Sequence, residues 1–283
     1  METMDDSSRF SIAPMVADYE VAGQRVAVVL FCWQGRTHRD AGAECQDFAA
    51  IYPSLAGDDT ERMTLVVADG VGTRSRSREG AEFACEAIGS ILSQTASDED
   101  RLSDRFAAGR SKFVELCASD ARKSALGMEH EEDENQTISK YATTALALCL
   151  DKRGYWAASV GDGAIYGLSQ DGTVAKLLTS INREGFVNEI RPLTNCQWQQ
   201  GFSESGSDFT VDPDIIGFCL MTDGLSECIG NPGLYFGSVW PELRKRLKDP
   251  EALGEYAEAF CQFWEDRKFS DDDKTLLAVF LNP

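Results

Sequence analysis

The chain has 283 residues, of which 43% are hydrophobic and 10% aromatic, and its formal net charge is −20. This composition suffices for a large buried core and predicts about one to two domains. The longest apolar run has eight residues, Val26 to Trp33, whereas a membrane-spanning helix needs about 18 or more. So large an excess of negative charge repels phosphate backbones and anionic membranes, so neither nucleic acid nor a membrane is an expected partner.

The cysteines and the first residues predict a cytoplasmic protein. The nine cysteines are widely spaced, odd in number and without a CxxC pair, so neither a disulfide framework nor a structural zinc site is expected. The opening METMDDSSRF is acidic, and the apolar segment of a secretory signal does not follow it. With His38 and His130 as the two histidines, a histidine-rich metal site is excluded.

The first half of the chain predicts an N-terminal extension, two strands and two helices. The extension covers residues 1–20, and the strands are apolar runs at 25–33 and 63–69. Apolar residues at helical spacing predict helices at 78–95 and 100–119. The acidic run 129–135 is expected to be a solvated loop, because like charges at such density do not pack, with attraction of cations as the alternative.

The second half begins with strands and returns to helices. Strands are predicted at 143–151, 155–162, 164–169, 173–178, 215–223 and 275–281, an irregular loop at 183–212, and helices at 239–247 and 251–267. The order is therefore strands, two helices, strands, two helices and a strand. Strands joined by short turns imply antiparallel sheets with helices packed outside, an α+β fold. A doubly wound fold fits poorly because helices do not alternate with single strands.

Carboxylates stand where several apolar runs end. Asp-Gly follows three of them, at Asp69, Asp162 and Asp223, and further acidic residues occur at Asp47 and in the cluster 271–273. An unpaired carboxylate at the end of a core strand is costly. Oxygen ligands from several strands suit a shared Mg²⁺ or Mn²⁺, and separate surface turns are the alternative. Asp171, in the hairpin turn SQDGTV, is interpreted as a turn residue only.

Six segments in order resemble the metal-dependent protein serine/threonine phosphatases of type 2C. They are GRTHRDAGAECQDF, LVVADGVG, ATTALALCL with WAASVGDGAIYGL, GFVNEI, CLMTDGLSE and DDDKTLLAVFL. The first and fourth resemble motifs of a bacterial subgroup in which a Ser/Thr-His stretch leads to Gln-Asp. The segments extend from residue 35 to residue 281, so the resemblance covers most of the chain.

The resemblance implies a fold and an activity. The fold is a four-layer α-β-β-α sandwich of two antiparallel sheets flanked by helix pairs, as a single domain over 1–283 with its core at about 22–282. The activity is hydrolysis of phosphoserine and phosphothreonine on proteins by a hydroxide that two Mn²⁺ or Mg²⁺ ions bridge. The expected partner is a phosphorylated protein, the target of a serine/threonine kinase in signalling, and the chain is expected to be a monomer.

The same resemblance implies roles for single residues. Asp69 would bridge both metals, the Gly70 carbonyl would ligate one, and Asp223 and Asp272 would complete the other shell. Asp272 stands three residues before Thr275, as the closing aspartate of the family stands before its Thr or Ser, whereas Asp271 and Asp273 are expected to be structural. Asp47 would bind metal directly or orient a metal-bound water, and with Asp69 it forms the implied catalytic pair. Asp162 is expected to fix its turn rather than bind metal.

Three departures from the family pattern affect the expected site. Gln46 stands where many members have a glutamate ligand, which predicts a weaker second metal. The phosphate-binding arginine is expected to be Arg39, with Arg36 as the alternative. Val71 replaces the histidine of some members, so a metal-bound water would protonate the leaving oxygen.

Two other functions compete with hydrolysis. One is a pseudophosphatase that uses the same fold as a binding or regulatory module, which Gln46 favours and which the joint presence of Asp69, Asp223 and Asp272 opposes. The other reads GVGTRSRSREG as a phosphate-binding loop of a nucleotide-binding protein. That segment lacks both the P-loop pattern and G-x-G-x-x-G spacing.

Overall fold

The computed structural model describes residues 9–56, 59–94, 101–124, 133–173, 175–179 and 191–283. Eleven strands form two antiparallel layers. The first layer has the order β8 (Ala175–Leu177), β7 (Ala164–Leu168), β10 (Gly217–Met221), β11 (Lys274–Leu281), β2 (Gln24–Trp33) and β1 (Phe10–Val21). The second contains β3 (Phe48–Ala56), β4 (Asp59–Ala68), β5 (Ala145–Asp151), β6 (Gly154–Val160) and β9 (Phe202–Asp208). A single parallel pair, Val21 with Thr60, joins the layers.

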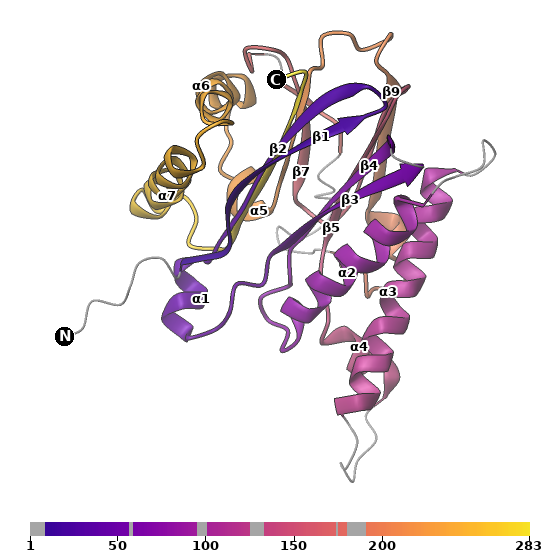
Figure 1. The fold of residues 1–283 in the computed structure, drawn as a ribbon. Coiled ribbons are helices and arrows are strands. Elements are labelled where there is room, and N and C mark those ends of the chain that lie inside the picture. The colour runs from indigo at the N-terminus through magenta and orange to yellow at the C-terminus, as the bar shows by residue number, and fades with distance from the viewer. Residues whose placement is uncertain (1–8, 57–58, 95–100, 125–132, 174, 180–190) are drawn as a thin grey trace.

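Two pairs of helices cover the outer faces of the sheets (Figure 1). Helices α2 (Ser77–Leu92) and α3 (Leu102–Ser124) pack on the second layer, and α6 (Pro232–Lys245) and α7 (Pro250–Asp266) on the first. The short elements are α1 (Arg36–Ala41), α4 (Glu134–Ser139), α5 (Asp223–Ser226) and a 3₁₀ turn, η2 (Trp198–Gly201). The predicted four-layer α-β-β-α sandwich is confirmed.

The long apolar runs arise because central strands are buried on both faces. In β2, Val28 and Leu30 belong to the core between the two sheets, whereas the alternate residues Val29 and Phe31 pack under α6 and α7. Side chains of a strand alternate between its faces, so a strand sandwiched between two apolar layers needs no polar positions. No helix within the described ranges is long and apolar enough to span a bilayer.

Several boundaries differ from the predicted ones. Strand β1 pairs with β2 along its length, so the sheet begins near residue 10 and not after an extension of 20 residues. Strands β3 and β9 were not predicted, and β9 lies inside the segment expected to be irregular. Helix α6 begins at Pro232, behind an Asn231 side chain that accepts from Leu234 N, seven residues before the predicted start. The predicted acidic loop at 129–135 falls largely outside the described residues.

Candidate metal centre

Three strand-end carboxylates converge at one edge of the sandwich. Asp69 follows β4, Asp162 lies just beyond β6, and Asp223 follows β10 and opens α5. Each offers a carboxylate oxygen, and these oxygens lie within 4.8 Å of one another. Strands β4 and β6 both pair antiparallel with β5, so they run in the same direction and end at the same edge. The arrangement brings together Asp69 and Asp223 and adds Asp162, which was expected to act in its turn.

The electrostatics of this cluster disfavour three negative charges without a cation. Burial, followed by repulsion from Asp223, Asp47 and Asp272, raises the pKa of Asp69 well above its ordinary value. Burial, then Asp162 and Asp272, raises the pKa of Asp223 to about 7. Buried carboxylates that repel one another gain most from divalent cations, which accept their oxygens as ligands. The donor set therefore fits Mg²⁺ or Mn²⁺.

Asp47 is held beneath this cluster by two hydroxyl groups. It is 1% exposed, and its Oδ2 accepts hydrogen bonds from Thr222 Oγ1 and Thr275 Oγ1, both at 2.8 Å. Thr222 immediately precedes Asp223, and Thr275 lies on β11. Burial, followed by repulsion from Asp273, raises the pKa of Asp47 although both threonines oppose the rise. The two hydroxyls fix the carboxylate on one oxygen and link it to both neighbouring segments.

The acidic run 271–273 divides into three different environments. Asp273 is 2% exposed; its Oδ1 accepts from Gly35 N at 2.7 Å, and its Oδ2 from Gln46 N at 2.6 Å and His38 Nδ1 at 2.8 Å. Asp271 lies 3.6 Å from Arg36. Asp272 is exposed and raises the pKa of the cluster carboxylates. The choice of Asp272 as the ligand and of its neighbours as structural residues stays a prediction.

Gly70 occupies a position that no other residue could fill. A Cβ there would lie 2.7 Å from the Ser77 carbonyl oxygen and 2.9 Å from that of Gln46. The amide of Gly70 donates to the Gln46 carbonyl at 3.2 Å. The close approach of these backbones joins the loop after β4 to the loop that carries Asp47.

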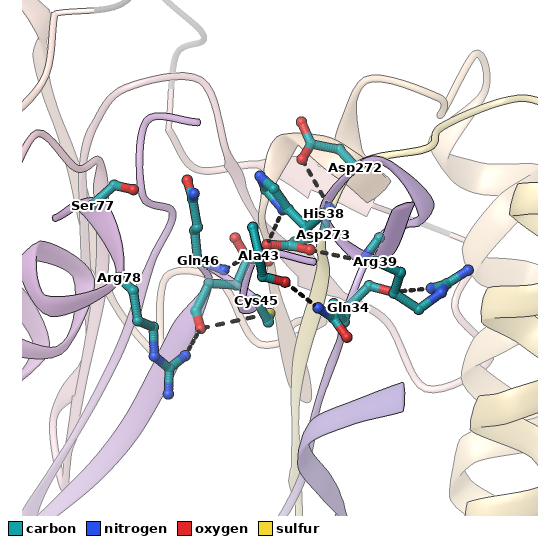
Figure 2. A network of polar contacts seen from close by, with 12 residues as sticks. Gln34, His38, Arg39, Ala43, Cys45, Gln46, Ser77, Arg78, Asp272 and Asp273 are labelled. Carbon is teal, nitrogen blue, oxygen red and sulfur yellow. Dashed lines mark hydrogen bonds and ion pairs between the residues drawn. The ribbon is translucent and has the colours of Figure 1, made fainter. Parts of the chain in front are cut away.

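Arg39, the predicted phosphate-binding residue, has a different partner. Its guanidinium donates to both carboxylate oxygens of Glu265, at 3.1 and 2.7 Å, and to the Gln34 carbonyl. Glu265 is fully buried and also accepts from Trp33 Nε1 at 2.8 Å. In Figure 2 the Arg39 side chain extends away from Gln46 and from the His38 ring. Arg39 therefore connects α1 to α7, and phosphate binding by Arg39, which stays a prediction, would require it to leave Glu265.

Three residues that position the side chains of the site could not be identified from the sequence. His38 is 9% exposed and contacts Asp273, which is 235 residues away along the chain. Thr222 and Thr275 donate to Asp47 and stand 175 and 228 residues from it along the chain. Each of the threonines adjoins or follows a predicted metal ligand, and this proximity is the only local signal that could have identified them. His38 lies in the segment GRTHRDAGAECQDF, which resembles a family motif, but no neighbouring residue indicates that its partner is Asp273.

The four-layer sandwich, with a half-buried carboxylate cluster at one edge, is the fold expected of a metal-dependent phosphatase. The sequence profile described as Protein phosphatase 2C matches residues 34–281, most of the chain. The chain therefore belongs to the protein phosphatase 2C family, and it is a metal-dependent protein serine/threonine phosphatase. The more specific assignment to a bacterial subgroup with a Gln-Asp motif stays a prediction.

Solved structures share the fold at low sequence identity. The serine/threonine phosphatase Stp1 from Staphylococcus aureus has a TM-score of 0.61 at 14% identity, with 99% of each chain covered. The S. agalactiae serine/threonine phosphatase has a TM-score of 0.56 at 16% identity, covering 90% of this chain and 99% of that one. RsbX in complex with magnesium has a TM-score of 0.52 at 15% identity, covering 95% and 99%. No curated protein matches the sequence significantly.

Proposed function

We propose that this chain removes phosphate from phosphoserine and phosphothreonine in proteins with two divalent cations held by Asp69, the Gly70 carbonyl, Asp223 and Asp272. The observation that carries the proposal is the convergence of Asp69, Asp162 and Asp223 within 4.8 Å, at a place where burial and mutual repulsion raise the pKa values of Asp69 and Asp223. When bound, the cations would supply Lewis acidity and a water of lowered pKa as the nucleophile.

The protein groups supply position and charge. Asp69 lies among the other carboxylates and is the residue proposed to contact both ions. Asp47, fixed on one oxygen by Thr222 and Thr275, presents its other oxygen as a ligand or as an acceptor for a metal-bound water. Asp162 lies with Asp69 and Asp223 in the cluster and contributes negative charge. None of the cysteines is needed as a nucleophile, because the cations activate water directly.

The proposed cations, substrate and partners follow from the protein family and from the net charge of the chain. The cations are Mn²⁺ or Mg²⁺, and RsbX, the fold neighbour in complex with magnesium, is a precedent for Mg²⁺. The substrate is a phosphoprotein made by a serine/threonine kinase, so the reaction reverses a signal in the cytoplasm. The chain acts as a monomer, and a net charge of −20 disfavours nucleic acid and anionic membranes as partners.

The test is phosphate release from a phosphothreonine peptide and from p-nitrophenyl phosphate. Activity should require Mn²⁺ or Mg²⁺ and disappear with excess chelator. Asp69→Asn and Asp223→Asn should each lower kcat at least about 100-fold, because each removes a charged ligand.

The matched control is Asp171→Asn, the same change at another Asp-Gly turn. Asp171 is exposed and accepts hydrogen bonds from Ser169 and Thr173 only, within the described residues. Its replacement should alter kcat less than about twofold. A folded wild-type protein that binds Mn²⁺ without turnover would instead favour the pseudophosphatase, and full activity in chelator would refute the mechanism.

A further inference from the structure

Two polar side-chain atoms lie beside Gly72, and one of them is buried. A Cβ on Gly72 would lie 3.7 Å from His38 Nε2 and 3.9 Å from Gln46 Oε1, so both atoms face the same small region. Within the described residues, Gln46 Oε1 is buried without a hydrogen-bond partner. Figure 2 shows the His38 ring between the Gln46 side chain and Asp272. A buried carbonyl oxygen without a donor is costly, which points to a ligand absent from the protein itself.

The tautomer of His38 is determined by Asp273. The Asp273 side chain accepts from the backbone amides of Gly35 and Gln46 through its two oxygens, so it acts as an acceptor toward His38 Nδ1 as well, at 2.8 Å, and Nδ1 carries the ring proton. The proton on Nδ1 leaves a lone pair on Nε2. A carboxylate that binds one nitrogen of an imidazole while the other nitrogen stays available is the common arrangement behind metal-ligating histidines.

We infer that His38 Nε2, Gln46 Oε1 and the Asp272 carboxylate bind one divalent cation, which makes Asp272 a ligand of the second metal beside Gln46, in place of the shell that it was expected to share with Asp223, and gives that position a nitrogen ligand. His38 and Asp272 offer ligand atoms within 4.8 Å of each other, and His38 is nine-tenths buried. Gln46 Oε1, which shares the neighbourhood of Gly72 with His38 Nε2, adds a third lone pair, and this amide oxygen carries no charge. This inference rests on the proposed function for the identity of the second cation, and it assigns His38 a role that the oxygen-only donor set lacks.

A nitrogen ligand changes which metal the position prefers. Mg²⁺ favours oxygen ligands and retains its waters, whereas imidazole is a ligand of first-row transition metals. His38 therefore favours Mn²⁺ over Mg²⁺ at this position. Asp273 acts as a positioning residue, because its hydrogen bonds orient the ring and set the tautomer.

Pulsed EPR of bound Mn²⁺ tests the inference without any turnover. Metal-free protein is titrated with one and then two equivalents of Mn²⁺, and imidazole ¹⁴N coupling is expected to grow with the weaker ion. Since the chain has two histidines, two variants assign the signal. The coupling should persist in His130→Gln and disappear in His38→Gln. Wild-type protein without imidazole coupling at two equivalents, or coupling lost only in His130→Gln, would overturn the inference, and the wild-type and His130→Gln spectra together decide even if His38→Gln does not fold.

Calorimetric titration gives a second measurement. His38→Gln should weaken the lower-affinity Mn²⁺ site about 10-fold or more, as loss of a metal-ligating group does, and should change the Mg²⁺ affinity less than twofold. Equal losses for both metals would show that His38 shapes the site without ligating the ion. Imidazole coupling in a protein that has no phosphatase activity would refute the proposed function and leave this metal site standing.

Discussion

At the scale of single residues, Gln46 is an amide where the family resemblance leads us to expect a carboxylate ligand. A neutral amide oxygen lacks the charge–charge attraction of a carboxylate, which is large at ligand distance. Gln46→Glu should therefore lower the Mn²⁺ concentration for half-maximal activity, by about 10-fold. The Gln46 side chain faces inward. Its Oε1 is buried without a partner in the described part of the chain, and it lies near the His38 ring beside Gly72.

The control for this charge change is Gln94→Glu, at an exposed residue two positions beyond the end of α2. It adds the same charge at a distance where solvent and salt screen it, so the Mn²⁺ titration should stay unchanged. Isothermal titration compares wild type with each variant. Equal Mn²⁺ affinity of wild type and Gln46→Glu would show that this glutamine does not weaken the second metal.

The strand-end carboxylates were predictable because each is encoded within a few residues. An apolar run that ends in Asp-Gly identifies Asp69 and Asp223, and the same local rule separates Asp171, which closes a hairpin with its neighbours. The role of Asp162 was less predictable, since its turn and its proximity to Asp69 and Asp223 have the same sequence signature. His38 was missed because its function depends on Asp273, and no local pattern encodes a contact across 235 residues.

At the scale of elements, Arg39 couples α1 to α7 and to the strand that carries the last carboxylates. Burial by itself would raise the pKa of the Glu265 carboxyl. The hydrogen bonds from Arg39 and from the Trp33 indole outweigh this effect, so the pKa is lowered. Lys274, also fully buried, lies 3.9 Å from Glu265 and donates to the Asp272 carbonyl at 2.7 Å. These contacts therefore connect the backbone of Asp272, a proposed metal ligand, to Glu265 on α7.

Arg39→Ala should destabilise the protein by about 3 kcal/mol, because it leaves a buried carboxylate short of a partner. Arg36→Ala, on the same helix, removes a pair whose side chains are 36% and 47% exposed and should cost at most about 0.5 kcal/mol. Urea unfolding compares the two. A raised KM for phosphopeptide without loss of stability in Arg39→Ala would restore the original interpretation of this residue as the phosphate ligand.

The elements that were missed are those whose sequence signal is weak on its own. Strand β9, FSESGSD, is polar and contains glycine, yet it pairs with β6 along seven residues because a neighbouring strand supplies the hydrogen bonds. Strand β1 alternates intermediate and exposed side chains, the pattern of an edge strand, and only its partner β2 is apolar throughout. Central strands and amphipathic helices were predictable, whereas edge strands depend on tertiary pairing.

At the scale of the whole molecule, the metal centre opposes folding when no metal is bound. The pKa of Asp223 rises to about 7 in the folded protein, above the ordinary value of about 3.9 that it recovers on unfolding. The folded state thus binds more protons between those values, and its free energy of unfolding falls as pH rises from about 4 to about 7. His38, whose pKa its hydrogen bond to Asp273 raises against the effect of burial, acts in the same direction, since its stabilisation is lost above its folded pKa.

Metal-free protein in chelator should therefore have a Tm at pH 7.5 that is several degrees below its Tm at pH 5.5. Mn²⁺ at about 100 times its Kd should restore about 2.7 kcal/mol at pH 7.5, because it binds the folded state alone.

In Asp223→Asn the repulsion is reduced, so the metal-free Tm should depend less on pH and rise less with Mn²⁺. Asp171→Asn is the control: that exposed carboxyl has a pKa lowered to about 2 by its contacts with Thr173 and Ser169, so it stays ionised across this pH range and its loss leaves the slope unchanged. Parallel Tm profiles for wild type and Asp223→Asn, measured by thermal unfolding at constant ionic strength, would show that the stability cost lies outside the carboxylate cluster, in the general repulsion of a chain with a net charge of −20.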